Sequence, residues 1–165
     1  MRPNTPKTND NHVVDTLKIR DMEYQRILGK LDHEAGSAPP MVLQQRAQPR
    51  YPHAVVFVIQ IHHPGGTCVN YVGRTRNISR SGLAFLHGNF LHNGTRCVIS
   101  LPLREGKWMR ITGTIVRCRH VESKVHELGV HFDEPIDLSD VIQAADEPSN
   151  TLTLPFGLGR YLKPL

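Results

Sequence analysis

The chain has 165 residues, of which 39% are hydrophobic and 21% charged, a length and composition that suit one folded domain with flanking segments. Its longest apolar run, Ala54–Ile59, is far shorter than the roughly 20 residues of a membrane-spanning helix, which excludes membrane insertion. The first residues lack the apolar stretch of a secretory signal, so we expect a cytoplasmic protein. The three cysteines include no CxxC pair, which argues against a disulfide framework or a zinc ribbon.

The net charge of +5 is concentrated in the middle of the chain. Residues 41–135 hold 12 basic and 5 acidic residues, and ten of the basic residues are arginines. The planar guanidinium group pairs with phosphates and with guanine edges, which favours an anionic or nucleotide ligand. A solvated basic surface explains the same charge equally well.

The first predicted element is an amphipathic helix. Its apolar residues recur at intervals of three, four or seven: Val14, Leu17, Tyr24, Leu28 and Leu31. An Asn or Asp within residues 9–11 can cap its start, Asp15 falls in its first turn, and Gly36–Pro40 ends it. We expect this stripe to pack on the folded domain or against a second copy of the chain, which would make a homodimer.

From His53 onward the pattern changes to short strands. Alternating or valine- and isoleucine-rich segments separated by turn residues predict six of them: Ala54–Ile61, Cys68–Thr75, Leu83–Leu86, Cys97–Leu103, Met109–Arg119 and Glu127–Phe132. Alternation in the longest places four residues on one face: Ile111, Gly113, Ile115 and Arg117. Because no helix intervenes, the pattern predicts a small antiparallel β-barrel or sandwich. A helix over Leu138–Ala145, capped by Asp137, is expected to close it.

Two motifs carry the candidate chemistry. The first is Arg46-Ala47-Gln48-Pro49-Arg50, in which Pro49 favours an extended chain that separates the two arginines by about 13 Å. The two side chains can therefore grip two parts of a larger anionic ligand, each binding a phosphate or the O6/N7 edge of a guanine. The alternative is that both linker arginines are simply solvated.

The second motif is Arg76-Asn77-Ile78-Ser79-Arg80-Ser81-Gly82, at the end of the second predicted strand. Strand alternation directs Ile78 into the core and places Asn77 and Ser79 side by side on the outer face. An amide and a hydroxyl there can recognise a base edge, and Gly82 permits a sharp turn or the close approach of a ligand. The alternative role for this Asn is an Asx-turn.

The two motifs in this order resemble a known family. An RxxxR immediately before the first strand, an NxSxxG about 30 residues later and the all-β pattern that follows are similar to the PilZ domain, a bacterial receptor domain for cyclic di-GMP. Gly113–Arg117 and Leu128–Phe132 resemble the late barrel strands of that family. The resemblance covers about residues 45–145.

The resemblance implies an all-β fold, a six-stranded antiparallel β-barrel with a C-terminal helix, to which this chain adds the N-terminal amphipathic helix. It also implies that cyclic di-GMP binds the outer surface of the barrel through five residues: Arg46, Arg50, Asn77, Ser79 and Gly82. The arginines would hold guanine and phosphate groups, the Asn and Ser would contact a guanine, and the Gly would shape the turn. Further candidate contacts are Gln45, Arg76 and Arg80.

We divide the chain into an N-terminal helix and linker (residues 1–40), a PilZ-like β-barrel domain (residues 41–147) and a C-terminal tail (residues 148–165). The sequence contains no GxSxG, HExxH or P-loop motif and no set of metal ligands at a recognised spacing. We therefore expect neither enzymatic activity nor a metal or other cofactor.

The function expected from these features is that of a cyclic di-GMP receptor in second-messenger signalling, which couples dinucleotide binding to a conformational change for a downstream protein partner. Two alternatives stay open. One is a PilZ-like protein-interaction adaptor with weak or no nucleotide binding, and the other is a basic nucleic-acid-binding β-barrel. The paired motifs favour the dinucleotide over nucleic acid as the partner.

Overall fold

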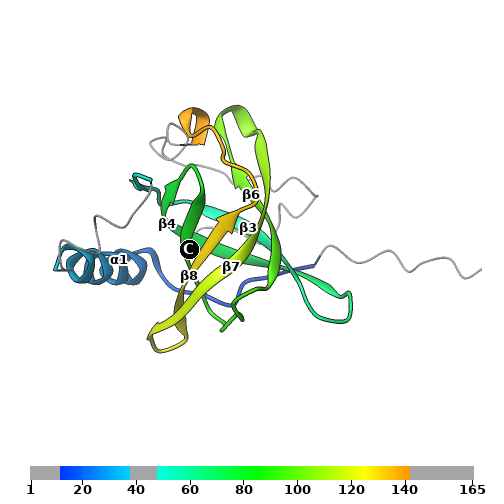
Figure 1. Cartoon of the computed structure of the whole chain (residues 1–165). Helices are drawn as coiled ribbons and strands as arrows, with labels where there is room; N and C mark the ends of the chain where they lie inside the picture. Colours follow the sequence, from blue (N-terminus) through cyan, green and yellow to red (C-terminus); the bar gives the residue numbers. More distant parts are fainter. Residues whose placement is uncertain (1–11, 38–47, 142–165) are drawn as a thin grey trace, which may run out of the picture.

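The computed structural model describes residues 12–37 and 48–141. Its elements follow in chain order: β1 (Val13–Val14), α1 (Asp21–Gly36), β2 (Tyr51–Pro52), β3 (Val56–His62), β4 (Cys68–Ser79), β5 (Gly82–His87), β6 (Arg96–Pro102), the 3-10 turn η1 (Arg104–Gly106), β7 (Trp108–Glu122) and β8 (Val125–Phe132). Figure 1 shows α1 lying outside a curved wall of strands.

Six of the strands close into an antiparallel β-barrel. They pair in the order β4-β3-β6-β7-β8-β5, and β5 pairs back with β4 to complete the ring. The six-stranded antiparallel barrel predicted from the sequence is therefore confirmed. Strand β4 extends to Ser79, beyond the predicted end at Thr75, because a β-bulge at Arg76 lets the pairing with β5 continue.

Two short strands that the sequence did not predict add to the barrel at β4. Strand β1 pairs with it in parallel, and β2 pairs with it antiparallel. In the second pairing Tyr51 lies opposite Ile78 and Pro52 opposite Asn77. The segment that directly follows the RxxxR motif is thus held against the strand that carries the NxSxxG motif.

The core fills the barrel interior with side chains from alternate strand positions. Phe57 and Phe85 lie at its centre with ring centroids 5.1 Å apart in an edge-to-face arrangement. Positions that alternate with the core on β5 and β8 face outward instead, so Leu86 and Val125 belong to a second apolar cluster outside the barrel. That second cluster is where α1 docks.

The predicted start of the N-terminal helix is wrong. Val13 and Val14 form β1, and α1 begins only at Asp21. Between them the carboxylate of Asp15 accepts the backbone N–H groups of Leu17 (3.0 Å) and Lys18 (3.2 Å), and Lys18 adopts a positive φ of 41°. A side-chain turn of this kind competes with helical hydrogen bonding. The chain therefore turns at Asp15, although the helical spacing of apolar residues in the sequence continues through this segment.

The end of the helix and its apolar contacts agree better with the sequence. Helix α1 ends at Gly36, as predicted, and buries Tyr24, Ile27 and Leu31 against Leu86 and other residues of the second cluster. Ile27, which is fully buried, was absent from the predicted stripe. The helix therefore packs on the chain's own barrel, the first of the two arrangements expected, whereas a homodimer stays a prediction.

After β8 the chain returns to the barrel core. Leu138 and Val141 are buried against it, residues 139–141 are helical, and the carboxylate of Asp137 accepts the backbone N–H of Ser139 (2.9 Å). The predicted cap is therefore present. The rest of the predicted helix and the C-terminal tail lie outside the described residues. Within those residues, no helix is both long and apolar enough to cross a bilayer.

A buried histidine joins the segment before β3 to the barrel and generates a pH prediction. His53 is 1% exposed, its Nδ1 lies 2.9 Å from Thr75 Oγ1, and burial lowers its pKa to about 4. Because the unfolded chain binds a proton that the folded chain excludes, the free energy of unfolding should fall by about 2 kcal/mol from this group between pH 7 and pH 5. Urea denaturation at both pH values measures the effect.

The variant His53→Asn should lose that part of the pH dependence. His62→Gln, a change at an exposed histidine of β3, serves as the control and should keep the parent's profile. Equal pH dependence in the parent and in His53→Asn would show that this histidine does not carry the effect.

Candidate functional site

A pocket of about 230 Å³ lies on the outer wall of the barrel, where β4, β5, β7 and β8 run side by side. We call it the wall pocket. Its polar lining comes from strands β4, β7 and β8, from the turn between β4 and β5 and from the segment before β2: Arg50, Asn77, Ser79, Ser81, Arg117 and His131. Gly82, Ala84 and Gly129 contribute to its floor, where small residues leave the space open.

The end of β4 supplies the polar edge predicted from the sequence. Ile78 is fully buried in the core, while Asn77 and Ser79 on either side of it line the wall pocket. The hydroxyl of Ser79 donates to the carbonyl of Gly82 at 3.3 Å, across the two-residue turn that connects β4 to β5. An amide and a hydroxyl are therefore held on a rigid strand end beside an open pocket.

Gly82 is required by the packing of two strands. A Cβ atom built on it would lie 2.5 Å from the carbonyl oxygen of Val130 in β8. Its φ is not positive, so the left-handed conformation of a tight turn is not the reason for this glycine. The sequence proposed a sharp turn or the close approach of a ligand. The structure shows a close approach of the β8 backbone, and the contact with a ligand stays a prediction.

The structure places only the second arginine of the RxxxR motif. Arg50 is exposed, directly precedes β2 and lines the wall pocket. The pairing of β2 with the end of β4 brings it beside Asn77. Gln45 and Arg46 lie outside the described residues.

Arg117 is a pocket residue that the sequence analysis missed. Alternation placed it on the same face as Ile111, Gly113 and Ile115, all three of which are buried. That prediction is wrong for Arg117 because a β-bulge intervenes: Ile115 pairs with Val130, and Arg117 pairs with the next residue of β8, Gly129. The bulge turns the side chain of Arg117 outward. The alternation of residues along a strand does not reveal where a bulge occurs.

A second pocket, of about 420 Å³, adjoins the first and is bounded by the C-terminal turns of α1. We call it the helix-side pocket. Its charged lining combines two acids of α1 with four arginines: Asp32, Glu34, Arg50, Arg76, Arg117 and Arg119. Because Arg50, Asn77 and Arg117 line both pockets, the two form one continuous polar region.

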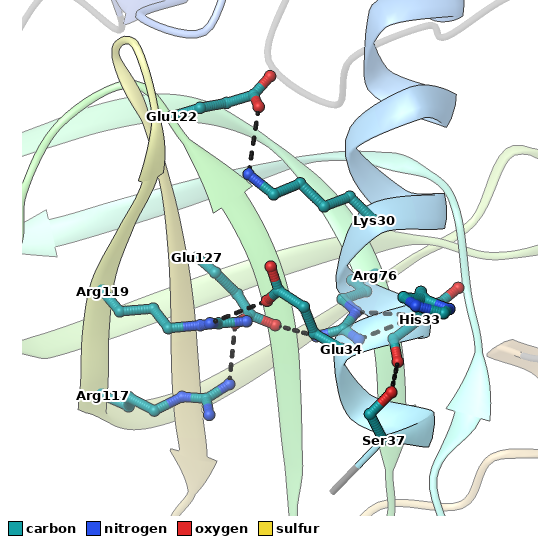
Figure 2. Close-up of polar contacts among 10 residues, drawn as sticks. Lys30, His33, Glu34, Ser37, Arg76, Arg117, Arg119, Glu122 and Glu127 are labelled. Carbon is teal, nitrogen blue, oxygen red and sulfur yellow. Dashed lines mark hydrogen bonds and ion pairs between the residues drawn. The ribbon is translucent and has the colours of Figure 1, made fainter.

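A buried carboxylate organises the arginines of this region. Glu127 of β8 is fully buried and pairs with Arg76, with Arg119 Nε (2.6 Å) and with Arg117 Nη2 (3.2 Å), as Figure 2 shows. Burial disfavours ionisation of Glu127, but the three guanidinium groups outweigh it and hold its pKa below the usual value. Glu127 is therefore an anion at neutral pH and fixes three cations on one wall of the barrel.

The further candidate contacts Arg76 and Arg80 have other surroundings. The side chain of Arg76 is 9% exposed, pairs with Asp32 and Glu127, and lines the helix-side pocket but not the wall pocket. Arg80 is exposed beside Tyr51 and Ile136, at a different hollow. The structure thus brings Arg50, Asn77, Ser79 and Gly82 together and does not bring Arg80 to them.

Comparison with known proteins identifies related domains. The family model described as "PilZ domain" matches residues 44–145. The inhibitor of motility MotI/DgrA of Bacillus subtilis is 20% identical with a TM-score of 0.42, and the match covers 62% of this chain and 49% of that one, so the chain spans about half of its length. The PilZ domain of Escherichia coli YcgR, solved with c-di-GMP, is 14% identical with a TM-score of 0.43, covering 61% and 86%. No curated protein matches the sequence.

The packing at Gly82 generates a stability prediction. Gly82→Ala should lower the free energy of unfolding by on the order of 1–3 kcal/mol, because the added methyl group forces β5 away from the β8 backbone. Chemical denaturation measures the change. The matched control is Gly29→Ala in α1, where the new Cβ meets open space and should stabilise the helix by roughly 0.5–1 kcal/mol. A Gly82→Ala protein as stable as the parent would contradict the steric explanation.

Proposed function

Because the chain belongs to the PilZ domain family, we propose that it is a non-enzymatic receptor for cyclic di-GMP, in which binding of the dinucleotide changes the conformation presented to a downstream protein partner. One observation carries the proposal. Arg50, Asn77 and Ser79 come from two motifs far apart in the sequence, yet they line one pocket on the outer wall of the barrel.

The chemistry of the wall pocket suits a guanine nucleotide. The amide of Asn77 can donate to and accept from a base edge, and the Ser79 hydroxyl adds a second polar group beside it. The guanidinium of Arg50 can bind either a phosphate or the O6 and N7 atoms of a guanine in a bidentate manner. Arg117, which lines the same pocket from β7, offers a second cation for the second phosphate of the ligand.

The volume of the wall pocket indicates which part of the dinucleotide it can hold. At about 230 Å³ the wall pocket is smaller than the roughly 300–1,000 Å³ of typical small-molecule sites. We therefore assign one guanine to it and place the phosphates towards Arg50 and Arg117, the two arginines at the junction with the helix-side pocket.

The ion pairs of the barrel favour this receptor over a general nucleic-acid binder. Five arginines of the basic middle segment pair with carboxylates: Arg74, Arg76, Arg96, Arg117 and Arg119. Their charge is therefore largely balanced within the molecule. A surface that binds long polyanions needs many cations free to neutralise successive phosphates.

Base specificity tests the proposal. The full chain should bind cyclic di-GMP at least tenfold more tightly than cyclic di-AMP, which lacks the guanine O6 acceptor and N2 amine and leaves polar groups of the site unpaired. Calorimetric competition with both dinucleotides and a short oligonucleotide at two salt concentrations measures this. Equal affinity for the two dinucleotides, or preference for the oligonucleotide, would overturn the proposal, and no binding to any of them would favour the adaptor.

Removal of one arginine tests the site. Arg50→Ala should weaken cyclic di-GMP binding by on the order of 2 kcal/mol, about 30-fold, because a charge-assisted contact is lost. Arg50→Lys should restore little of it, because an ammonium group cannot make the bidentate contact. Arg110→Ala, at an exposed arginine of β7 that lines neither pocket, is the control with the same charge change. Unchanged affinity in Arg50→Ala would remove this arginine from the site.

A further inference from the structure

The last turn of α1 is held to the barrel differently from the rest of the helix. Tyr24, Ile27 and Leu31 are buried in the second apolar cluster, but none of the residues from Asp32 to Gly36 is buried. What holds this turn is charge: Asp32 Oδ1 lies 3.0 Å from Arg76 Nη2, and Glu34 Oε2 lies 3.4 Å from Arg119 Nη1.

These two acids bind arginines that belong to the candidate site. Asp32 and Glu34 line the helix-side pocket together with the arginines that they pair with. Figure 2 shows Glu34 and Glu127 at the same guanidinium of Arg119, where Glu34 pairs with Nη1 and Glu127 pairs with Nε. The carboxylates of α1 thus lie in the same pocket as Arg50 and Arg117, the two arginines assigned to the phosphates of the ligand.

The charges that form ion pairs around Glu127 and the last turn of α1 balance before any ligand is added. Three arginines (Arg76, Arg117 and Arg119) face three carboxylates (Asp32, Glu34 and Glu127). Arg117 is the least constrained of the three cations, because half of its side chain is exposed and its only ion pair, among the described residues, is the 3.2 Å contact to Glu127. A phosphate at the junction of the two pockets would draw Arg117 outward and leave two arginines, Arg76 and Arg119, paired with three carboxylates.

We propose that the last turn of α1, residues Asp32–Gly36, is an internal competitor of the ligand, so that its docking on Arg76 and Arg119 and the binding of cyclic di-GMP oppose each other. The inference rests on the proposed receptor function and names the regulation of that site. Opposition of this kind is reciprocal: the factor by which the docked turn weakens ligand binding is also the factor by which bound ligand weakens docking of the turn.

The remainder of the helix stays in place when the ligand binds. Its buried apolar residues pack in the second apolar cluster, and Arg26 and Lys30 hold it to Glu122 in the hairpin between β7 and β8. The conformational change is therefore confined to the turn that leads into the RxxxR segment.

Two variants of α1 test the competition. Asp32→Asn combined with Glu34→Gln removes both competing charges while keeping the shape of the side chains, and it should raise the affinity for cyclic di-GMP at least about fivefold. Glu23→Gln is the control, because it removes a charge from the exposed first turn of α1, far along the helix from the site. Calorimetry gives the affinities of the full-length parent and both variants.

Amide hydrogen exchange supplies the second readout. In the parent, saturating cyclic di-GMP should speed exchange of the backbone amides of residues 33–37 and leave those around Ile27 unchanged. Equal or weaker affinity in the double variant, with binding by the parent intact, would overturn the competition and leave the receptor function standing. No binding by the parent or by either variant would overturn the receptor function itself, whereas binding by the double variant alone would support both.

Discussion

The arrangement depends on one buried anion, the carboxylate of Glu127. A charge enclosed by a barrel wall and a helix is tolerated only when cations surround it, and removing one partner from such a set typically costs about 3–5 kcal/mol. Here β4 supplies Arg76 and β7 supplies Arg117 and Arg119, so both strands are held in a fixed relation to β8, which carries Glu127. Arg76 and Arg119 also bind the last turn of α1, whereas Arg117 lines the wall pocket. A single ionised group therefore connects the helix to the candidate ligand site.

A second polar node fixes the other elements of the site. Thr75, which is fully buried in β4, donates from its hydroxyl to the carbonyl of His53 (2.8 Å) and accepts the backbone N–H of Val55 (2.8 Å). The carbonyl of Thr75 accepts the hydroxyl of Tyr24 from α1. One residue thus ties the helix and the segment after Arg50 to the strand that carries Asn77. Buried polar groups that are fully hydrogen-bonded specify a unique geometry, which a preorganised binding site needs.

The sequence predicted those features that depend on local pattern and failed where tertiary contacts decide. The six barrel strands and the polar edge formed by Asn77 and Ser79 follow from alternation, and the structure confirms both. The predicted start of α1 was wrong because the turn at Asp15 prevents helix formation there, although the helical spacing of apolar residues continues through this turn. Arg117 was missed because a bulge reverses its side, and the role of Arg76 depends on a carboxylate 51 residues away. Bulges and buried ion pairs leave no periodic trace in the sequence.

A two-dimensional NMR titration of the full chain with cyclic di-GMP tests most directly whether the pocket beside β4 is the receptor site. The largest shifts in amide resonances should fall on two stretches that line the wall pocket, Asn77–Gly82 and Gly129–His131, with a second group at the last turn of α1. Specific binding at these residues would also locate the ligand relative to Arg117. Shifts confined to a distant region such as the turn between β3 and β4, or spectra that do not change at saturating ligand, would contradict the receptor site.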